Sequence, residues 1–414
     1  MDIDPIVTNT FGPLISQVFA SVYILAIFIA PVCFAILFFQ SFVLWRKNAF
    51  IHSKLKDAVL LEITPPKQFL KSPLAMELFL TALYQTSGES TWIDRYIYGK
   101  VRPWFSLEIV SFEGQIKFYV WTWDYWKPIV TSYLYAQYPD AVVTEVPDYA
   151  ARAHFDPKGS DDIFGIEFVL NKPDIYPIKS YHDYNLGDDP KEELKVDPTT
   201  PLFEFLSMLN KGEQIWFQIL VRAHKKERPK PGTWFQKVDW QHAAKEEIKK
   251  LKSADVQEAG EIKISGASLS KTEKEVIDAI EKNVSKLAFD TVIRAIYIAP
   301  KSIYNKLNQS GLSGTFRQYN TGHLNSFSAE PKHTTDFDYP WQDFKNHRLN
   351  KRKKHIMHAY QTRHGFHDPH KSHFFTLSTE SLATIYHFPT ETAKTPTIQR
   401  IEAKRSEPPA NLPI

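Results

Sequence analysis

The sequence predicts an α+β protein that is held at a membrane by one N-terminal helix. Two observations support this prediction: a long uncharged segment lies near the N-terminus, and the order β-α-β-β-α-β can be traced twice in the residues that follow. That order is typical of the ferredoxin-like fold, in which helices cover one face of an antiparallel sheet. We therefore predict a single transmembrane helix followed by two tandem ferredoxin-like domains, the second with a helical insertion.

The uncharged segment runs from Phe11 to Leu44. A helix from Val18 to Leu44 would be roughly 40 Å long, which exceeds the hydrocarbon thickness of a bilayer, about 30 Å. A cleaved signal peptide is the alternative, but its apolar core would be shorter and would follow basic residues. The predicted divisions are a short extracytoplasmic N-terminus (residues 1–17), the transmembrane helix (18–44) and a basic juxtamembrane linker (45–57).

The orientation follows from the charges that flank this helix. The basic residues all lie on its C-terminal side, namely Arg46, Lys47, Lys54 and Lys56. The positive-inside rule then leaves the rest of the chain in the cytoplasm, with the N-terminus outside. We expect a single-pass protein of the inner (plasma) membrane.

The first ferredoxin-like domain is predicted at residues 58–150. Its expected elements are a strand at Ala58–Ile63, a helix from Leu74 through Tyr84, strands at Trp104–Phe112 and Gln115–Trp123, a helix at Tyr125–Gln137 and a strand at Ala141–Val146. The two central strands flank Glu113-Gly114, a dipeptide that suits a tight hairpin turn.

The second domain is predicted at residues 160–330, with a helical insertion at 233–288 and a C-terminal extension at 331–414. Its expected elements are strands at Phe164–Leu170, Gln214–Ala223, Thr291–Ala299 and Leu324–Phe327, and helices at Leu202–Leu209 and Ser302–Tyr319. The insertion contains two Lys- and Glu-rich amphipathic helices, Val238–Leu251 and Lys271–Leu287. Such a pair forms either a solvated hairpin or a docking element.

Motifs of the common enzyme classes are absent from the sequence. It contains no P-loop, no Gly-x-Gly-x-x-Gly, no His-Glu-x-x-His and no Gly-x-Ser-x-Gly. The only cysteine, Cys33, lies inside the apolar segment, which excludes cysteine-based zinc sites and intramolecular disulfides. We predict a non-enzyme without a cofactor.

Two local clusters have side chains that bind ions. His364, His367, His370 and His373 recur at every third residue and could ligate zinc or copper, although Gly365 and Pro369 favour an ordinary surface loop. Arg348, Lys351, Arg352, Lys353 and Lys354, followed by His355, could contact the phosphates of nucleic acid or anionic lipid. A solvated helix face is the alternative for this basic run, which contains no interleaved aromatic residue.

Four short segments carry a family resemblance: Lys71–Glu77, Tyr135–Asp140 with Pro147–Tyr149, Leu382–Pro389 and Glu407–Pro413. They resemble an uncharacterised family of membrane-anchored proteins that is similar to the N-terminal, non-motor part of conjugation and type IV secretion ATPases. In the longer relatives a P-loop motor domain follows the proline-rich segment. This sequence ends there, so no catalytic residue can be carried over.

The resemblance implies a non-catalytic, membrane-anchored adaptor or scaffold of a conjugation-like or type IV secretion-like system. Its expected partners are the lipid bilayer, a P-loop motor ATPase supplied in trans and further copies of itself. Two other hypotheses stay open at this point. One is a membrane-tethered nucleic-acid-binding protein that uses the basic run, and the other is a metal-dependent enzyme that uses the histidines between His364 and His373.

Overall fold

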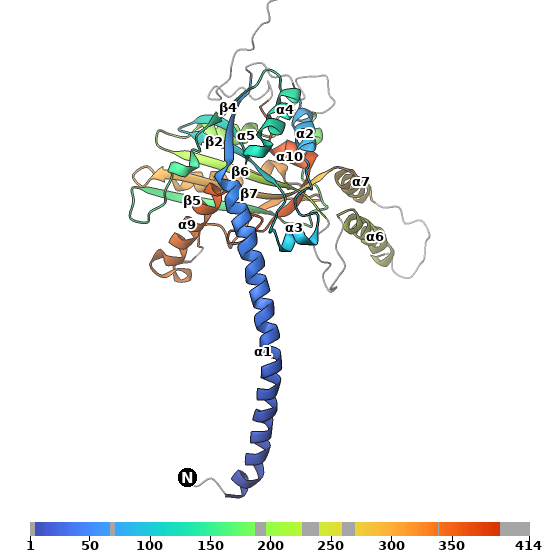
Figure 1. Ribbon diagram of the computed structural model, residues 1–414. Helices are drawn as coiled ribbons and strands as arrows, with labels where there is room; N and C mark the ends of the chain where they lie inside the picture. Colours follow the sequence, from blue (N-terminus) through green and yellow to red (C-terminus); the bar gives the residue numbers. More distant parts are fainter. Residues whose placement is uncertain are drawn as a thin grey trace, which may run out of the picture. The chain divides into compact units, whose positions relative to one another are not determined.

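The computed structural model describes residues 5–66, 71–186, 196–225, 240–258, 270–337 and 339–389 (Figure 1). The chain divides into two compact units. The anchor unit comprises residues 1–54 and 88–101, and the sheet unit comprises residues 55–87 and 102–414. The proline-rich segment at residues 407–413 lies outside the described residues.

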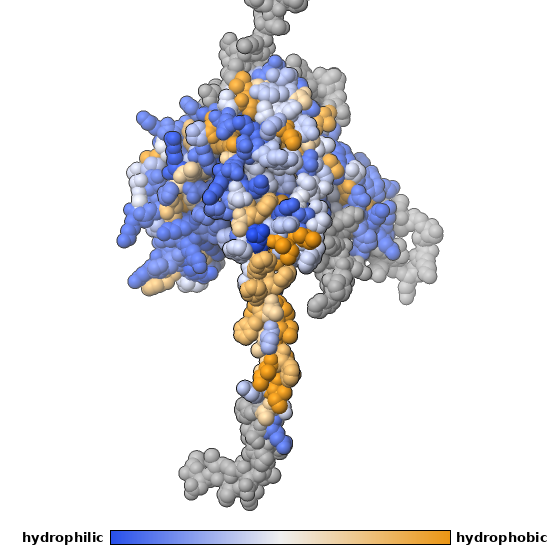
Figure 2. Space-filling model, viewed as in Figure 1, coloured by the Kyte–Doolittle hydropathy of each residue, from blue (hydrophilic) through white to orange (hydrophobic). Residues whose placement is uncertain are grey.

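The anchor unit is dominated by one long helix, α1 (Pro5–Lys56). From Ala20 onward this helix is long and apolar enough to cross a membrane. Its apolar side chains are exposed in Figure 2, and Phe28 is 72% accessible. Such a continuous apolar surface is costly in water and suits lipid. Residues 45–56 continue the helix, so the expected juxtamembrane linker is helical.

A short segment that was not predicted completes the anchor unit. Helix α3 (Trp92–Tyr96) begins at Thr91, whose side chain accepts a hydrogen bond from the backbone N–H of Asp94. This N-cap satisfies one of the free donors at the helix start. The Tyr96 ring lies 6.1 Å from that of Phe39 on α1, so the 88–101 segment packs against the anchor helix.

Within the described part of the sheet unit, the strands form one nine-stranded antiparallel sheet. The strands are β1 (Ala58–Thr64), β2 (Trp104–Phe112), β3 (Gln115–Trp123), β4 (Val142–Val146), β5 (Asp161–Leu170), β6 (Gln214–Ala223), β7 (Ala288–Pro300), β8 (Phe327–Ala329) and β9 (Phe375–Ser378). Their order is β4-β1-β3-β2-β6-β7-β5-β8, and β9 pairs with β7. The α+β prediction is therefore confirmed. The two predicted domains share one continuous sheet, because β2 pairs with β6 along its full length.

The predicted hairpin between β2 and β3 is also confirmed. Both turn residues have positive φ, 54° at Glu113 and 87° at Gly114. A type I′ turn requires this conformation at both central positions, and its twist matches that of the flanking strands. The Glu113-Gly114 dipeptide therefore sets the register of the hairpin.

One face of the sheet is apolar and covered by helices. These are α2 (Leu74–Ala82), α4 (Lys127–Gln137), α5 (Thr200–Ser207) and α10 (Thr379–Ile385), and Figure 1 shows them grouped together. Phe118 of β3 contacts the rings of Phe203 and Phe388 at centroid distances of 5.8 and 5.2 Å. Burying such side chains contributes roughly 1.5–3 kcal/mol each.

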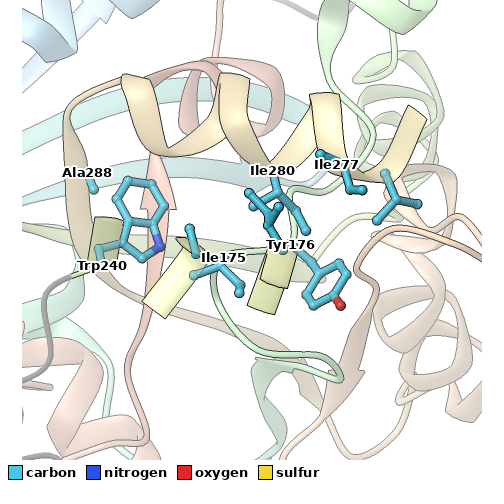
Figure 3. Close-up of a cluster of buried hydrophobic side chains, with 9 residues drawn as sticks. Ile175, Tyr176, Trp240, Ile277, Ile280 and Ala288 are labelled. Carbon is cyan, nitrogen blue, oxygen red and sulfur yellow. The ribbon is translucent and has the colours of Figure 1, made fainter. Parts of the chain in front are cut away.

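The predicted insertion forms two packed helices, α6 (Trp240–Glu258) and α7 (Lys271–Ser285). Figure 3 shows that their apolar side chains meet Ile175 and Tyr176 in a separate small core. Ser270 and Glu273 form a capping box at the start of α7. The insertion is thus attached to the sheet unit through its apolar stripe, while its charged face stays in solvent.

The region predicted as a C-terminal extension contributes to the core of the sheet unit. Helix α8 (Lys306–Gly314) and β8 still belong to the predicted second domain. The first helix of the predicted extension is α9 (His347–Gln361). Strand β9 then pairs with β7, and every residue of α10 is buried. The sheet unit therefore depends on residues up to at least Phe388.

Candidate functional site

A row of polar side chains crosses the other face of the sheet, opposite the apolar face. The strand register aligns Glu62, Tyr119, Glu108, Gln218, Arg294 and Glu167 on β1, β3, β2, β6, β7 and β5 in turn. Residues paired across an antiparallel sheet point to the same face. We call this set the polar row. Its four members from Glu108 to Glu167 are buried, so each needs a partner.

The partner of Glu108 comes from the C-terminal part of the chain. Arg363 Nε lies 3.1 Å from Glu108 Oε1, and Arg363 also pairs with Asp148. The hydroxyl of Tyr149 donates a 2.7 Å hydrogen bond to Glu108 Oε2 and lies 2.7 Å from the hydroxyl of Tyr360. Burial alone would lower the pKa of Arg363, but the two carboxylates outweigh it and raise that pKa above its ordinary value.

The second half of the polar row supplies its own cation. Arg294 Nε lies 3.3 Å from Glu167 Oε1, and His333 pairs with the other oxygen of Glu167. Burial would raise the pKa of Glu167, yet Arg294 and His333 together lower it. The hydrogen bond to Glu167 in turn raises the pKa of His333. Glu167 and His333 therefore each favour the charged form of the other.

A third buried carboxylate lies nearer one end of the same strands. Asp290 Oδ2 is 2.8 Å from Arg222 Nη2, and Asp290 Oδ1 is 2.7 Å from His224 Nδ1. Burial raises the pKa of Asp290, but the hydrogen bond from His224 and the charge of Arg222 lower it to about 2. Among the described residues, these three buried carboxylates each face a cation. Such paired charges hold segments together rather than act as free acids or bases.

A cleft of about 620 Å³ opens beside the Asp148 and Tyr149 end of this network. Its lining includes aromatic side chains from the sheet, Phe112 and Trp216, whose rings lie 6.5 Å apart. Arg152 and His154 belong to the lining and are exposed. An apolar floor with a few polar groups is the usual composition of a binding site. The sequence did not reveal this cleft, because its lining comes from segments between residues 112 and 357.

The four candidate histidines do not converge on one point. His364 is buried beside Trp104, and His367 Nε2 lies 3.4 Å from Arg222 Nη1. His373 faces Glu330, whereas His370 contacts His355 and His358 of α9 through ring nitrogens 2.9 and 2.7 Å apart. Across the described ranges, no group of three or more His, Cys, Asp or Glu residues is arranged to hold a metal ion.

The basic run lies on α9 and divides into two groups. Arg348, Lys351 and Lys354 are exposed, whereas Lys353 is buried and pairs with Asp162. Arg352 is half-buried, and its Nη1 donates to the carbonyl of Thr334. Lys353 is therefore not available to an external phosphate.

Exposed aromatic residues lie immediately before α9. Trp341 and Phe344 are 78% and 79% accessible, and the Trp341 ring stacks on Tyr339 at 4.5 Å. Arg348 and Arg352 both lie over the ring of Phe337. The exposed basic side chains thus have aromatic neighbours in the chain, which the basic run alone did not indicate.

The fold and the site define a class of protein with one helix able to cross a membrane and an antiparallel α+β unit in which buried Glu108, Glu167 and Asp290 are paired with internal cations. Within that class, the chain belongs to the family described as "Domain of unknown function (DUF8128)", whose model matches residues 46–401. That match covers most of the chain and begins at the end of the apolar segment. None of the curated proteins matches the chain.

Proposed function

We propose that this protein is a non-catalytic, membrane-anchored adaptor of a conjugation-like or type IV secretion-like system, which docks a cytoplasmic P-loop ATPase. The internal pairing of the buried carboxylates is the observation on which this proposal chiefly rests. Glu108, Glu167 and Asp290 all neutralise cations within the fold, which suits a rigid scaffold. Lys71–Glu77 and the other short segments resemble the non-motor part of such ATPases. This resemblance supports the assignment to a conjugation-like or type IV secretion-like system.

The scaffold in this proposal is a duplicated ferredoxin-like unit. The order β4-β1-β3-β2 in the first half corresponds position by position to β8-β5-β7-β6 in the second. Both are the order that a β-α-β-β-α-β chain gives in the ferredoxin-like fold. The equivalent strands β2 and β6 join the halves. Duplication of one unit followed by joining of its edge strands accounts for the single sheet.

The proposed location is the inner membrane, with the N-terminus outside and the sheet unit in the cytoplasm. The basic residues that flank the apolar segment on its C-terminal side support this orientation. A cytoplasmic sheet unit is required if the partner is a motor that consumes ATP. Protease added outside intact cells should therefore leave the sheet unit uncut, and its digestion there would refute the proposed topology.

The cleft is the proposed docking surface for the ATPase, because it combines an apolar floor with exposed charges. The full chain, purified in detergent with an affinity tag, should recover a P-loop ATPase from its own cell membranes. Arg152→Glu combined with His154→Glu should reduce that recovery by at least tenfold, since both side chains are exposed at the cleft.

Lys274→Glu is the matched control, because it reverses an exposed charge on α7, away from the cleft. Recovery with this variant should equal that of the unaltered protein. A pull-down that never recovers a motor ATPase would refute the adaptor proposal. Equal recovery with the cleft variant would refute only the docking surface.

A second candidate function is membrane-tethered nucleic-acid binding, which the exposed aromatic and basic residues around α9 favour. Trp341 and Phe344 could stack on bases while Arg348 and Lys351 contact phosphates. Single-stranded DNA should then be retained at low salt and released as salt rises. Trp341→Ala with Phe344→Ala should weaken retention, and no retention at low salt would end this alternative.

A further inference from the structure

We infer that the 88–101 segment is a second membrane-binding element, which lies in the headgroup region of the bilayer beside the end of the transmembrane helix. The inference rests on the membrane anchoring in the proposed function. It adds a contact between lipid and a part of the chain that is not apolar enough to be recognised as a membrane segment.

The contacts of this segment place it at a defined level of α1. Besides the Tyr96–Phe39 ring contact, Arg46 Nε donates a 2.8 Å hydrogen bond to the carbonyl of Ile97. Gly99 has a φ of +65°, and a Cβ atom there would lie 2.5 Å from the carbonyl carbon of Arg46. The backbone of the segment therefore approaches that of α1 at the point where the uncharged segment ends.

The side of the segment that does not contact α1 is apolar and exposed. Trp92 and Ile93 are 63% and 51% accessible, and Tyr98 is 52% accessible. Trp45 on the adjacent part of α1 is also exposed. Tryptophan and tyrosine favour the interface between lipid and water, where an apolar ring and a polar group are both satisfied.

The charges of the segment are compatible with a lipid surface. The Lys100 ammonium lies 2.7 Å from a carboxylate oxygen of Asp94, and Arg95 lies 3.9 Å from Glu89. Both acidic groups thus have a cation beside them within the segment. Little negative charge remains to be repelled by anionic headgroups, and the neighbouring Arg46 and Lys47 would attract them.

The length of α1 agrees with this placement. The 21 residues from Val18 to Phe38 span roughly 31 Å as a helix, which matches a hydrocarbon core of about 30 Å. Phe39 to Lys47, the stretch that the segment contacts, then falls in the headgroup region. The uncharged segment is longer than the hydrocarbon core, and a helix of that length would otherwise have to tilt. With its last residues in the headgroup region, no tilt is needed.

Spin labels in reconstituted vesicles test the inference. In a Cys33→Ala background, single cysteines at Trp92, Ile93 or Tyr98 would carry a nitroxide in the full chain. The vesicles would contain phosphatidylcholine and phosphatidylglycerol. Collisions with oxygen report lipid, and collisions with a water-soluble nickel chelate report solvent. We expect nickel collision rates several-fold lower at these three positions than at Met208, an exposed residue of the sheet unit.

A label at Phe28, an exposed residue of α1, separates failure of the anchor from failure of this inference. Lipid-like values at Phe28 with solvent-like values at residues 92, 93 and 98 would overturn the inference alone. Solvent-like values at Phe28 would overturn the anchoring as well. Protection from both oxygen and nickel at residues 92, 93 and 98 would indicate a protein partner, and would also overturn the inference.

The variant Gly99→Val tests whether contact with α1 positions the segment. Its side chain would meet the Arg46 backbone, so nickel collisions at a Tyr98 label should rise several-fold. Gly322→Val is the matched control, because a Cβ there meets nothing within 4 Å. If nickel collisions do not rise with Gly99→Val, contact with α1 does not position the segment. The collision rates measured without that substitution still decide whether the segment lies in the headgroup region.

Discussion

The two halves of the sheet neutralise their buried carboxylates in different ways. Each half buries one carboxylate in the polar row, Glu108 in the first and Glu167 in the second. The second half places its cation, Arg294, on a strand of the sheet itself. The first half obtains its cation, Arg363, from a segment 255 residues further along the chain. The first half is therefore completed only when the C-terminal segment covers the sheet.

The largest expected effect comes from removing these two cations. Arg363→Met should lower the free energy of unfolding by about 3–5 kcal/mol, because it leaves buried Glu108 and part-buried Asp148 without their cation. Arg294→Met should cost less, roughly 2–4 kcal/mol, because His333 stays beside Glu167. Denaturant unfolding of the full chain in detergent would measure both. An equal or larger loss for Arg294→Met would contradict the comparison.

Glu108 and Gln218, which lie opposite each other on β2 and β6 at the centre of the sheet, offer a second test. Gln218 Nε2 donates a 3.0 Å hydrogen bond to Glu108 Oε1. Gln218→Glu would place two carboxylates together, so we expect a loss of about 2–4 kcal/mol at pH 8. The added carboxyl would have a raised pKa, so the loss should shrink as the pH falls. Gln218→Met, which removes only the hydrogen bond, should cost about 1–2 kcal/mol without that pH dependence.

The buried side chain of His364 leads us to expect a loss of stability in mild acid. Burial, together with the charge of Arg294, lowers the pKa of His364 to about 4. The unfolded chain would take up this proton near pH 6.5. Stability should therefore fall as the pH drops from about 6.5 to 4, by roughly 1–3 kcal/mol for this residue. His364→Phe should flatten that slope, whereas His242→Gln, at an exposed position on α6, should not.

The smallest expected effect concerns the hydroxyl of Tyr149. Tyr149→Phe removes its bonds to Glu108 and Tyr360, and should cost about 1–2 kcal/mol because Glu108 keeps Arg363 and Gln218. Tyr125→Phe, at a highly exposed position, should change stability by less than about 0.5 kcal/mol. A loss for Tyr149→Phe as large as that for Arg363→Met would show that the tyrosine, not the ion pair, holds the segment.

Hydropathy pattern and turn chemistry were sufficient to predict most strands of the sheet. β2, β3 and β6 have the predicted bounds, because buried strands carry dense β-branched and aromatic residues. The helix α3 was missed because five residues carry no periodicity. The strand β9 was missed because Phe375–Ser378 is short and follows a His-rich segment.

The polar row could not be predicted, for a physical reason. Glu108 and Arg294 each sit in an apolar strand, where a single charged residue is equally consistent with a solvated face. Only the register of the strands shows that these residues align and are buried. The basic run likewise hides Lys353, whose burial depends on Asp162, 191 residues earlier. Pairings across such distances leave no local pattern in a sequence.

The position of β1 has a mechanical consequence. Only Asp57 separates the end of α1 from the start of β1, so tension transmitted along α1 passes directly into this strand. β1 has neighbours on both edges, with six residue pairs to β3 and five to β4. Its extraction would require two hydrogen-bonded ladders to fail together. The strand that directly follows the helix able to cross a membrane is therefore held along both of its edges.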